Sequence, residues 1–361
     1  MLAVFRTLII SAVTCAGNLV TAQTSTTGNQ HKTILPTDNK HLFSGEGEKF
    51  YMYVYRSFEG KKSRPWTAGK YGFVRNIKRT EDGVIGTRFH EGIDIKPLER
   101  DRANKPLDKI KAIASGTVAY ANSTSSRSNY GKYVVIEHLW DCGPIYSLYA
   151  HLSAVSVKAG QKIEQGESIG VMGYTGAGLN RERSHLHLEL NLLLSEQFAQ
   201  WHSKYLGGKN YHGVHNGMNM AGLDIAGYYI AQKRNPSLTL PQFVRTQPVY
   251  YKVTIPRTTG TKQLGLLKRY PWLAAGSEKN KSPSWEISFT ASSFPIAILP
   301  SQRTVSAPRI TSVRKCKSKH SYHTKGFVNG TGYRASLSDR GKRFISLITG
   351  SFIEDNSSES P

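Results

Sequence analysis

Short runs of β-forming residues separated by glycine fill the middle of the chain, and this pattern limits the fold more than any other feature. Between about residues 84 and 194 the runs alternate apolar and polar residues or are rich in β-branched residues, with little helical periodicity. The runs are DKIKAIASGTVAYA, KYVVIEHLW, IYSLYAHLS, SIGVMG and HLHLELNL. Glycine between them tolerates the backbone angles of tight turns. The pattern predicts a mainly β protein with a compact sheet domain.

Two histidines stand one residue apart in the last of these runs, within SHLHLEL. On a strand, side chains two positions apart point to the same face, so His185 and His187 would project together while Leu186 and Leu188 face the core. Such a pair can hold a metal ion. The alternative is a pair of ordinary half-buried imidazoles, and the pair alone is a weak metal signal.

Further histidines and an aspartate occur earlier in the same region. His90 and Asp94 flank Gly92 in RFHEGIDIK, and on a strand the three positions would share one face, with room for an ion at the glycine. His151 ends the run that begins at Ile145. Catalytic zinc needs three protein ligands, a position open to water and a nearby proton-transfer group. The chain supplies that set.

The order of these motifs resembles one peptidase family. H-x-x-x-D, then Y-A-H-L-S, then GYTG and H-L-H is similar to the lysostaphin-type (glycyl-glycine or LytM-like) zinc metalloendopeptidases, which cut peptidoglycan peptides. The resemblance covers roughly residues 84 to 194 and implies an antiparallel β-sheet peptidase domain of the duplicated hybrid motif type. It implies that His90, Asp94 and His187 bind Zn²⁺. It also implies that His185 and His151 are catalytic and flank the attacking water and the transition-state oxyanion.

Two segments depart from the pattern of that family. Residues 95–111 form a longer and more charged link than the one expected there, and GAGLNRERS replaces a short polar stretch before H-L-H. We expect both segments to rim the cleft. Arg181, Glu182 and Arg183 would then influence which peptide fits.

The first 22 residues have the features of a signal peptide, with Arg6, an apolar stretch from Leu8 to Val20 and small residues before a cleavage site after Ala22. A membrane anchor is the alternative, but polar residues interrupt the stretch, and the mature chain has no other candidate for a transmembrane segment. We therefore expect an exported protein in the periplasm or extracellular space.

The chain is strongly basic. Its formal net charge of +23 falls to +22 when Arg6 is removed with the leader. A positive field raises the encounter rate with anionic polymers of the cell envelope. Nucleic acid is the competing partner, but no zinc-finger spacing, RNA-binding aromatic motif or basic helix supports it. We therefore expect no nucleic-acid partner.

The rest of the chain divides into an N-terminal extension (23–83), the peptidase domain (84–255), a linker (256–269), a β-rich accessory module of unknown family (270–350) and a disordered tail (351–361). Within the second of these, SEQFAQWHSKYLGG predicts a helix capped by Ser195, and His212 and His215 are expected to be polar loop residues near the cleft rather than ligands. Ser338 is expected to begin a late helix. Cys142 and Cys316 can pair in an oxidising compartment, and the sequence does not decide whether they do.

Together these features predict an exported zinc metalloendopeptidase that hydrolyses peptide bonds in peptidoglycan cross-links or stem peptides. The alternative is a non-catalytic protein of the same fold that binds the cell wall or activates a hydrolase. Retention of all five motif residues favours the enzyme. The sequence leaves open which bond is cut and whether residues 23–83 are inhibitory.

Overall fold

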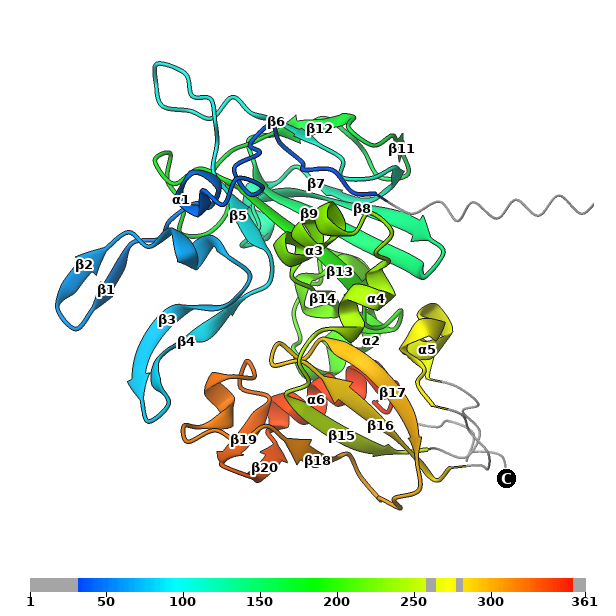
Figure 1. Cartoon of the computed structure of the whole chain (residues 1–361). Coiled ribbons are helices and arrows are strands. Elements are labelled where there is room, and N and C mark those ends of the chain that lie inside the picture. The colour runs from blue at the N-terminus through cyan, green and yellow to red at the C-terminus, as the bar shows by residue number, and fades with distance from the viewer. Residues whose placement is uncertain (1–31, 258–263, 277–281, 353–361) are drawn as a thin grey trace, which may run out of the picture.

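The computed structural model describes residues 32–257, 264–276 and 282–352, and it is drawn in Figure 1. The predicted signal peptide and most of the predicted tail lie outside the described residues. Among the described residues, no helix has the length and apolar character needed to cross a bilayer.

The largest sheet is entirely antiparallel and lies at the centre of the molecule (Figure 1). Its strand order is β11-β7-β8-β9-β13-β14, and β5 pairs with β13 on the same side as β14. The strands are β5 (Ile93–Ile95), β7 (Gly116–Asn122), β8 (Lys132–Trp140), β9 (Gly143–Leu152), β11 (Lys162–Ile163), β13 (Leu186–Leu193) and β14 (Met220–Gly222). Four of these runs were expected from the sequence, and the predicted mainly β, antiparallel fold is confirmed.

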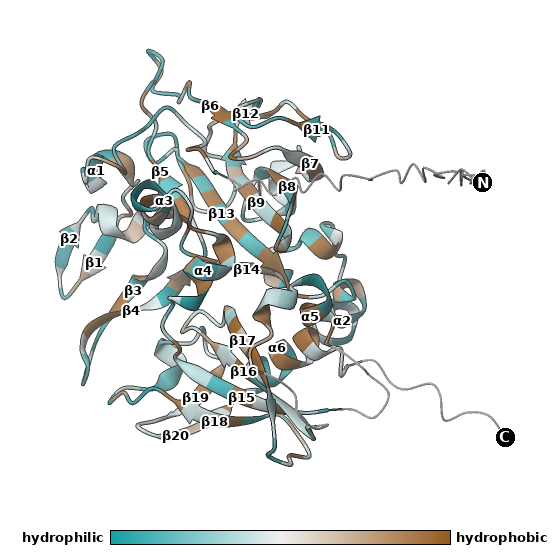
Figure 2. Cartoon of the chain, turned by 45° about the vertical axis from the view of Figure 1, so that its right-hand side comes forward, coloured by the Kyte–Doolittle hydropathy of each residue, from teal (hydrophilic) through white to brown (hydrophobic). Residues whose placement is uncertain are grey.

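Strand β13 is buried along its whole length of eight residues. Leu186, Leu188 and Leu190 lie in the main hydrophobic core, as the alternation predicted. Leu193 lies in a second, smaller core with side chains of β8 and β9. Figure 2 shows the hydrophobic bands, in brown, alternating along β13. A strand buried on both faces holds its polar side chains rigidly.

Smaller elements surround this sheet. A three-stranded sheet has the order β10-β12-β6, and there are two separate hairpins, β1-β2 and β3-β4. These strands are β1 (Arg56–Phe58), β2 (Lys61–Ser63), β3 (Gly72–Thr80), β4 (Gly83–His90), β6 (Lys109–Lys111), β10 (Ala154–Val155) and β12 (Ser168–Val171). The helices outside the C-terminal module are α1 (Gly47–Phe50), α2 (Phe198–Tyr205), α3 (Ile225–Arg234), α4 (Leu240–Arg245) and α5 (Gly265–Arg269).

A second antiparallel sheet forms the C-terminal module, with the order β17-β16-β15-β18. Its strands are β15 (Tyr251–Pro256), β16 (Ser284–Phe289), β17 (Pro295–Ser301) and β18 (Arg309–Val313), followed by the hairpin β19 (Val328–Thr331) and β20 (Arg334–Leu337). Helix α6 (Asp339–Thr349) completes the module and buries an apolar face that includes Phe344, Ile345 and Ile348. Ser338 caps this helix through its bond from Gly341 N–H, as expected.

Several boundaries differ from the sequence expectations. Strand β15 pairs with β16 and β18, so the second sheet begins at Tyr251 rather than after the predicted linker. Helix α5 occupies the end of that linker, because Leu266 and Leu267 are buried in the core; residues 258–263 lie outside the described part of the chain. The predicted boundary at residue 83 falls at the turn of the β3-β4 hairpin, which pairs residues on both sides of it.

Two smaller details of the prediction were also tested. Helix α2 begins after Gln197, and Ser195 does not cap it, because Ser195 lies two residues before the N-cap position and its hydroxyl oxygen accepts a bond from the N–H of Gln197 itself. Cys142 and Cys316 are both free thiols.

Candidate metal centre and its cleft

Three strands bring His90, Asp94 and His187 to one point. His90 ends β4, Asp94 is the central residue of β5, and His187 lies on β13 directly opposite Asp94 in the antiparallel register. All three side chains are buried, with exposed fractions of 3%, 2% and 6%. The sheet therefore unites residues that are almost 100 positions apart in the sequence.

The facing atoms of these residues form a nearly equilateral triangle. His90 Nε2 lies 3.0 Å from His187 Nδ1, and Asp94 Oδ1 lies 3.0 Å from each of these nitrogens. His90 Nδ1 binds the Lys70 carbonyl oxygen at 2.7 Å, and His187 Nε2 binds Glu189 Oε1 at 2.7 Å. In neutral rings that donate these two bonds, the nitrogens facing Asp94 carry lone pairs.

This donor set fits a divalent cation. Three lone-pair atoms at these separations need a proton or a cation between them, and two imidazoles with one carboxylate are ligands that suit zinc. Zinc lies about 2.0–2.2 Å from nitrogen and oxygen ligands, a distance compatible with a triangle of this size. A fourth position then remains on the cleft side.

Glycine is required at position 92 for a different reason from the one expected. Residues 91 and 92 form a bend between β4 and β5, so positions 90, 92 and 94 do not share one continuous strand face. A Cβ on Gly92 would lie 2.2 Å from the Leu188 carbonyl oxygen and 2.8 Å from Glu189 Cγ. The glycine thus permits close approach to the backbone of β13 rather than making room for an ion.

His185 and His151 lie beside the triangle. His185 Nε2 is 3.3 Å from Asp94 Oδ1, and its Nδ1 is 2.7 Å from the Arg183 carbonyl oxygen. His151 Nδ1 is 2.8 Å from the Thr175 carbonyl oxygen, and its ring centroid is 5.0 Å from that of His185. The backbone at His151 has φ of 65°, a left-handed conformation that is uncommon outside glycine. The structure therefore brings all five predicted residues together.

Outer partners of the triangle include residues that the sequence reasoning missed. Glu189 accepts bonds from Tyr130 OH at 2.7 Å and from Asn191 Nδ2 at 3.0 Å while it binds His187. Arg75 of β3 donates to Asp94 Oδ2. The alternation that singled out His185 and His187 also places Glu189 on the same face of the strand. An acidic residue within a run of leucines was the signal in the sequence that could have identified it. Arg75 has no such signal.

Burial and neighbouring charges shift the titration of these groups. Burial acts to lower the pKa of His187, but its bonds with Asp94 and Glu189 outweigh this and raise the pKa to about 9. Burial lowers the pKa of His90, and burial together with the nearby histidines holds the pKa of His151 well below its ordinary value. Burial would raise the pKa of Asp94, yet His185, His90 and Arg75 together hold it well below its ordinary value.

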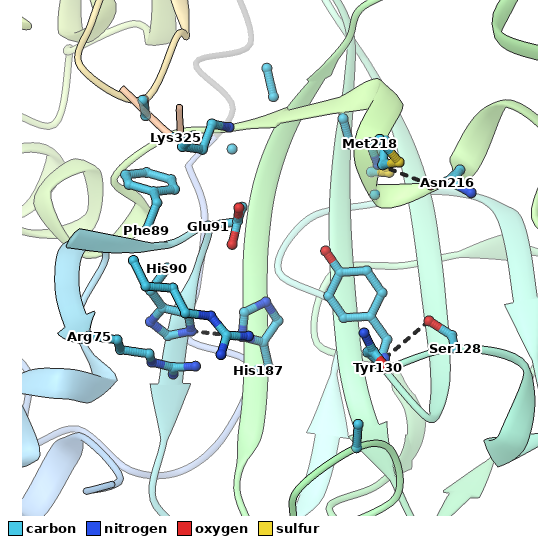
Figure 3. Close-up of a pocket in the computed structure, with 18 of the residues that line it drawn as sticks. Arg75, Phe89, His90, Glu91, Ser128, Tyr130, His187, Asn216, Met218 and Lys325 are labelled. Atoms are coloured by element: carbon cyan, nitrogen blue, oxygen red, sulfur yellow. Dashed lines mark hydrogen bonds between the residues drawn. The ribbon is translucent and has the colours of Figure 1, made fainter. Parts of the chain in front are cut away.

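The triangle opens into a cleft of about 1520 Å³ between the peptidase region and the C-terminal module. Figure 3 shows His90 and His187 between Arg75 and Tyr130, with Phe89 and Lys325 farther along the cleft. Acidic lining residues are Glu91, Asp94 and Asp339, whereas the basic ones are Arg56, Arg75, Arg88, Arg127, Arg183, Lys209, Lys325, Arg340 and Arg343. The cleft is therefore strongly cationic.

The predicted rim is only partly correct. Arg183 lines the cleft, but Arg181 and Glu182 do not. Glu182 instead accepts bonds from the hydroxyls of Tyr53 and Tyr55. Arg100, in the long 95–111 segment, donates to the carbonyl oxygens of Arg181 and Glu182, so this segment packs behind the loop and does not line the cleft.

The two later histidines lie outside the triangle, as expected, and only His212 is among the residues that line the cleft. His212 lines the cleft, and its ring binds Tyr120 OH and the Arg127 carbonyl oxygen, each at 3.0 Å. His215 stacks on Tyr120 with ring centroids 6.3 Å apart.

Comparisons with known proteins agree with this geometry. A family model described as Peptidase family M23 matches residues 88–198. The cell division protein DipM of Caulobacter vibrioides is 35% identical over 109 residues, 29% of this chain and 15% of DipM. The peptidoglycan DD-endopeptidase ShyA of Vibrio cholerae is 38% identical over 86 residues, 22% of this chain and 18% of ShyA. The matches thus span less than a fifth of either relative.

Among solved structures, the catalytic domain of the antimicrobial peptidase lysostaphin from Staphylococcus simulans is similar, with 25% sequence identity and a TM-score of 0.24. The match covers 34% of this chain and 75% of that domain.

Proposed function

We propose that this chain, which matches the model of Peptidase family M23 over residues 88–198, is an exported zinc endopeptidase that hydrolyses peptide bonds of peptidoglycan, in the periplasm or outside the cell. The observation that supports this most is the convergence of His90 Nε2, Asp94 Oδ1 and His187 Nδ1 at 3.0 Å, with two further histidines alongside. A zinc ion bound there supplies a Lewis acid that activates water and polarises a carbonyl.

The two remaining histidines differ in how they can handle a proton. His151 binds a carbonyl oxygen through Nδ1, so a neutral ring presents the Nε2 lone pair to the cleft and can accept a proton from water. His185 faces an acceptor at both nitrogens, the Arg183 carbonyl oxygen and Asp94 Oδ1. We assign proton acceptance to His151 and hydrogen-bond donation to the developing oxyanion to His185.

The charge of the cleft supports a substrate with carboxylates. Lys325, Arg340 and Arg343 of the C-terminal module line the wall of the cleft together with Arg88 and Arg183 of the peptidase region. Peptides of the bacterial wall carry free carboxylates, and a cationic low-dielectric cleft concentrates such ligands. Both parts of the chain would therefore contact the substrate.

The test is digestion of purified peptidoglycan by the full-length mature chain, as the metal-free protein and after zinc is restored. We expect new amino groups only with zinc, and mass spectrometry of defined muropeptides would identify the bond. His185→Ala should keep bound zinc but lose at least about 100-fold in turnover, because it removes a transition-state donor.

A matched control is His215→Ala, which removes a histidine that stacks on Tyr120 and is neither in the triangle nor among the residues that line the cleft. This variant should retain most of the turnover. Folded, zinc-loaded wild-type protein that releases no amino groups from any peptidoglycan would reject the enzyme and favour the non-catalytic alternative.

A further inference from the structure

A second cluster of metal-ligating side chains lies at the tip of the β3-β4 hairpin, away from the triangle. Asp82 is in the turn of this hairpin, Cys316 follows β18, and His320 and His323 lie on and just after a short 3-10 helix, η6 (His320–Tyr322). We propose that Asp82, Cys316, His320 and His323 bind a divalent transition metal of the zinc class.

The distances support a shared ligand. One ligand atom from each of Asp82, Cys316 and His323 lies within 4.8 Å of the others. His320 Nδ1 is 3.2 Å from Cys316 Sγ, although His320 is not among the residues whose ligand atoms all lie within 4.8 Å of one another. Ligand atoms around tetrahedral zinc are roughly 3.3–3.8 Å apart, so the atoms of Asp82, Cys316 and His323 need to contract by at most about 1.5 Å, and His320 must turn toward them to become the fourth ligand. A half-buried loop cluster can make that adjustment.

The side chains are already oriented by outer bonds. His320 Nε2 donates to the Gly332 carbonyl oxygen at 3.1 Å, which leaves Nδ1 with a lone pair toward Cys316. Asp82 is fixed by the backbone N–H groups of Lys317 and Ser318 and by the Ser318 hydroxyl. Metal-binding histidines usually donate their other N–H to a backbone carbonyl in this way.

The ligand chemistry selects the class of metal. One thiolate, two imidazoles and one carboxylate favour Zn²⁺ or Co²⁺ over Mg²⁺ and Ca²⁺, which take oxygen ligands. The spacing Cys-x₃-His-x₂-His in CKSKHSYH places three of the ligands within eight residues. Asp82 comes from a segment more than 230 positions earlier. A bound metal would therefore link the β3-β4 hairpin to the C-terminal module through coordinate bonds.

This position connects the second site to the cleft. Strand β4 begins beside Asp82 and ends at His90, and Lys325 of the C-terminal module lies over Phe89 of the same strand, with Nζ 5.2 Å from the ring centroid. Figure 1 shows the hairpin extending from the central sheet toward the module. A metal at the tip would fix the position of this hairpin, and with it the cleft-lining residues Phe89 and His90, relative to the module. This inference stands on its own residues and does not require peptidase activity.

Cobalt distinguishes the two sites, because only the second contains a thiolate. The full-length mature chain, freed of metal and kept reduced, is titrated with Co²⁺ while the near-ultraviolet thiolate-to-cobalt charge-transfer band and the bound metal are measured. We expect two equivalents and a thiolate band for the wild type. Cys316→Ser should bind one equivalent without the band, whereas His90→Ala should bind one equivalent and keep it.

Cys142→Ser is the matched control, since it removes the other free thiol and should leave the band and both equivalents unchanged. The inference is overturned by a reduced, folded wild-type chain that binds cobalt without a thiolate band. It is equally overturned if Cys316→Ser retains the band. Loss of the first site alone, seen with His90→Ala, reports on the proposed function and not on this one.

Discussion

At the level of single residues, the two buried acids Asp94 and Glu189 have different roles in the candidate metal centre. Asp94 Oδ1 faces three histidines, whereas Oδ2 accepts a hydrogen bond from Arg75. Oδ1 is therefore the oxygen that can bind a cation. Glu189 does not face the triangle but fixes the ring of His187 from behind. A ligand and its outer partner should therefore respond differently to substitution.

Glu189→Gln should weaken zinc binding by about 10–100-fold while leaving the ligands in place, because the amide lacks the charge that makes His187 a basic ligand. Competition with a zinc chelator measures the change. Glu137→Gln is the control. Glu137 also accepts a hydrogen bond from a tyrosine hydroxyl at 2.7 Å, that of Tyr146, but it is not a partner of any residue of the triangle. Equal affinities for the two variants would contradict the assigned role.

Cys142 should be nearly unreactive in the folded chain, because burial raises the pKa of its thiol to about 11. A raised pKa means less thiolate at a given pH, so alkylation should quicken about tenfold per pH unit from pH 8 until it levels off near 11. Mass spectrometry of the labelled peptide gives the rate. Unfolded chain serves as the reference, and a folded rate that matches it at pH 8 would refute the prediction.

Part of the site was predicted from the sequence, and part of it depends on contacts between distant segments. His185 and His187 were found because a period of two on one strand is a local property. His90, Asp94 and His151 were candidates from their residue types and spacing, but their division into zinc ligands and catalytic residues came from the resemblance to a known motif order. Arg75 reaches Asp94 through the pairing of β3 with β4, and nothing in its neighbours in sequence marks that contact.

At the level of elements, the contact between the bend before β5 and strand β13 holds the ligands together. Gly92 packs against the Leu188 carbonyl oxygen, and the opposed pair of Asp94 and His187 lies two residues away. Any atom added at Gly92 must push these two segments apart.

Gly92→Ala should therefore lower the free energy of unfolding by about 1–3 kcal/mol and also reduce bound zinc, because relief of the clash separates Asp94 from His187. Denaturant unfolding and metal analysis check both effects. Gly265→Ala is the control, since its nearest heavy atom would be 3.6 Å from the added Cβ. An alanine at Gly92 tolerated as well as one at Gly265 would rule out this packing role.

Elements were predicted well where the pattern is local and poorly where tertiary contacts decide. β8 matches its predicted run, and α6 begins after Ser338 as expected. The sequence YKVTIP is typical of a strand but does not show which sheet the strand joins. The pairing with β16 places β15 in the second sheet. Helix α5 forms at the end of a basic, threonine-rich segment that was predicted to be a linker, because the helix buries its two leucines.

At the scale of the whole molecule, the C-terminal module is attached to the peptidase sheet by buried polar contacts. Tyr270 OH donates to the Pro144 carbonyl oxygen at 2.9 Å and accepts from Leu193 N–H at 2.8 Å, which links it to β9 and β13. Trp201 Nε1 on α2 donates to the Arg343 carbonyl oxygen on α6. The module thus forms a wall of the cleft and supports the strands that carry the site.

Tyr270→Phe should cost about 1–3 kcal/mol of unfolding free energy, because it leaves the buried Leu193 N–H and Pro144 carbonyl without their partner. Denaturant unfolding measures the loss. Tyr333→Phe offers the comparison, as that side chain is 73% exposed. Indistinguishable unfolding curves for the two variants would show that the module is not anchored through Tyr270.

The measurement closest to the central claim is anomalous scattering at the zinc edge from crystals of the zinc-loaded, full-length mature chain. The account predicts a peak about 2.0–2.2 Å from each of His90 Nε2, Asp94 Oδ1 and His187 Nδ1. A stoichiometrically loaded protein with no peak among these three atoms would contradict it.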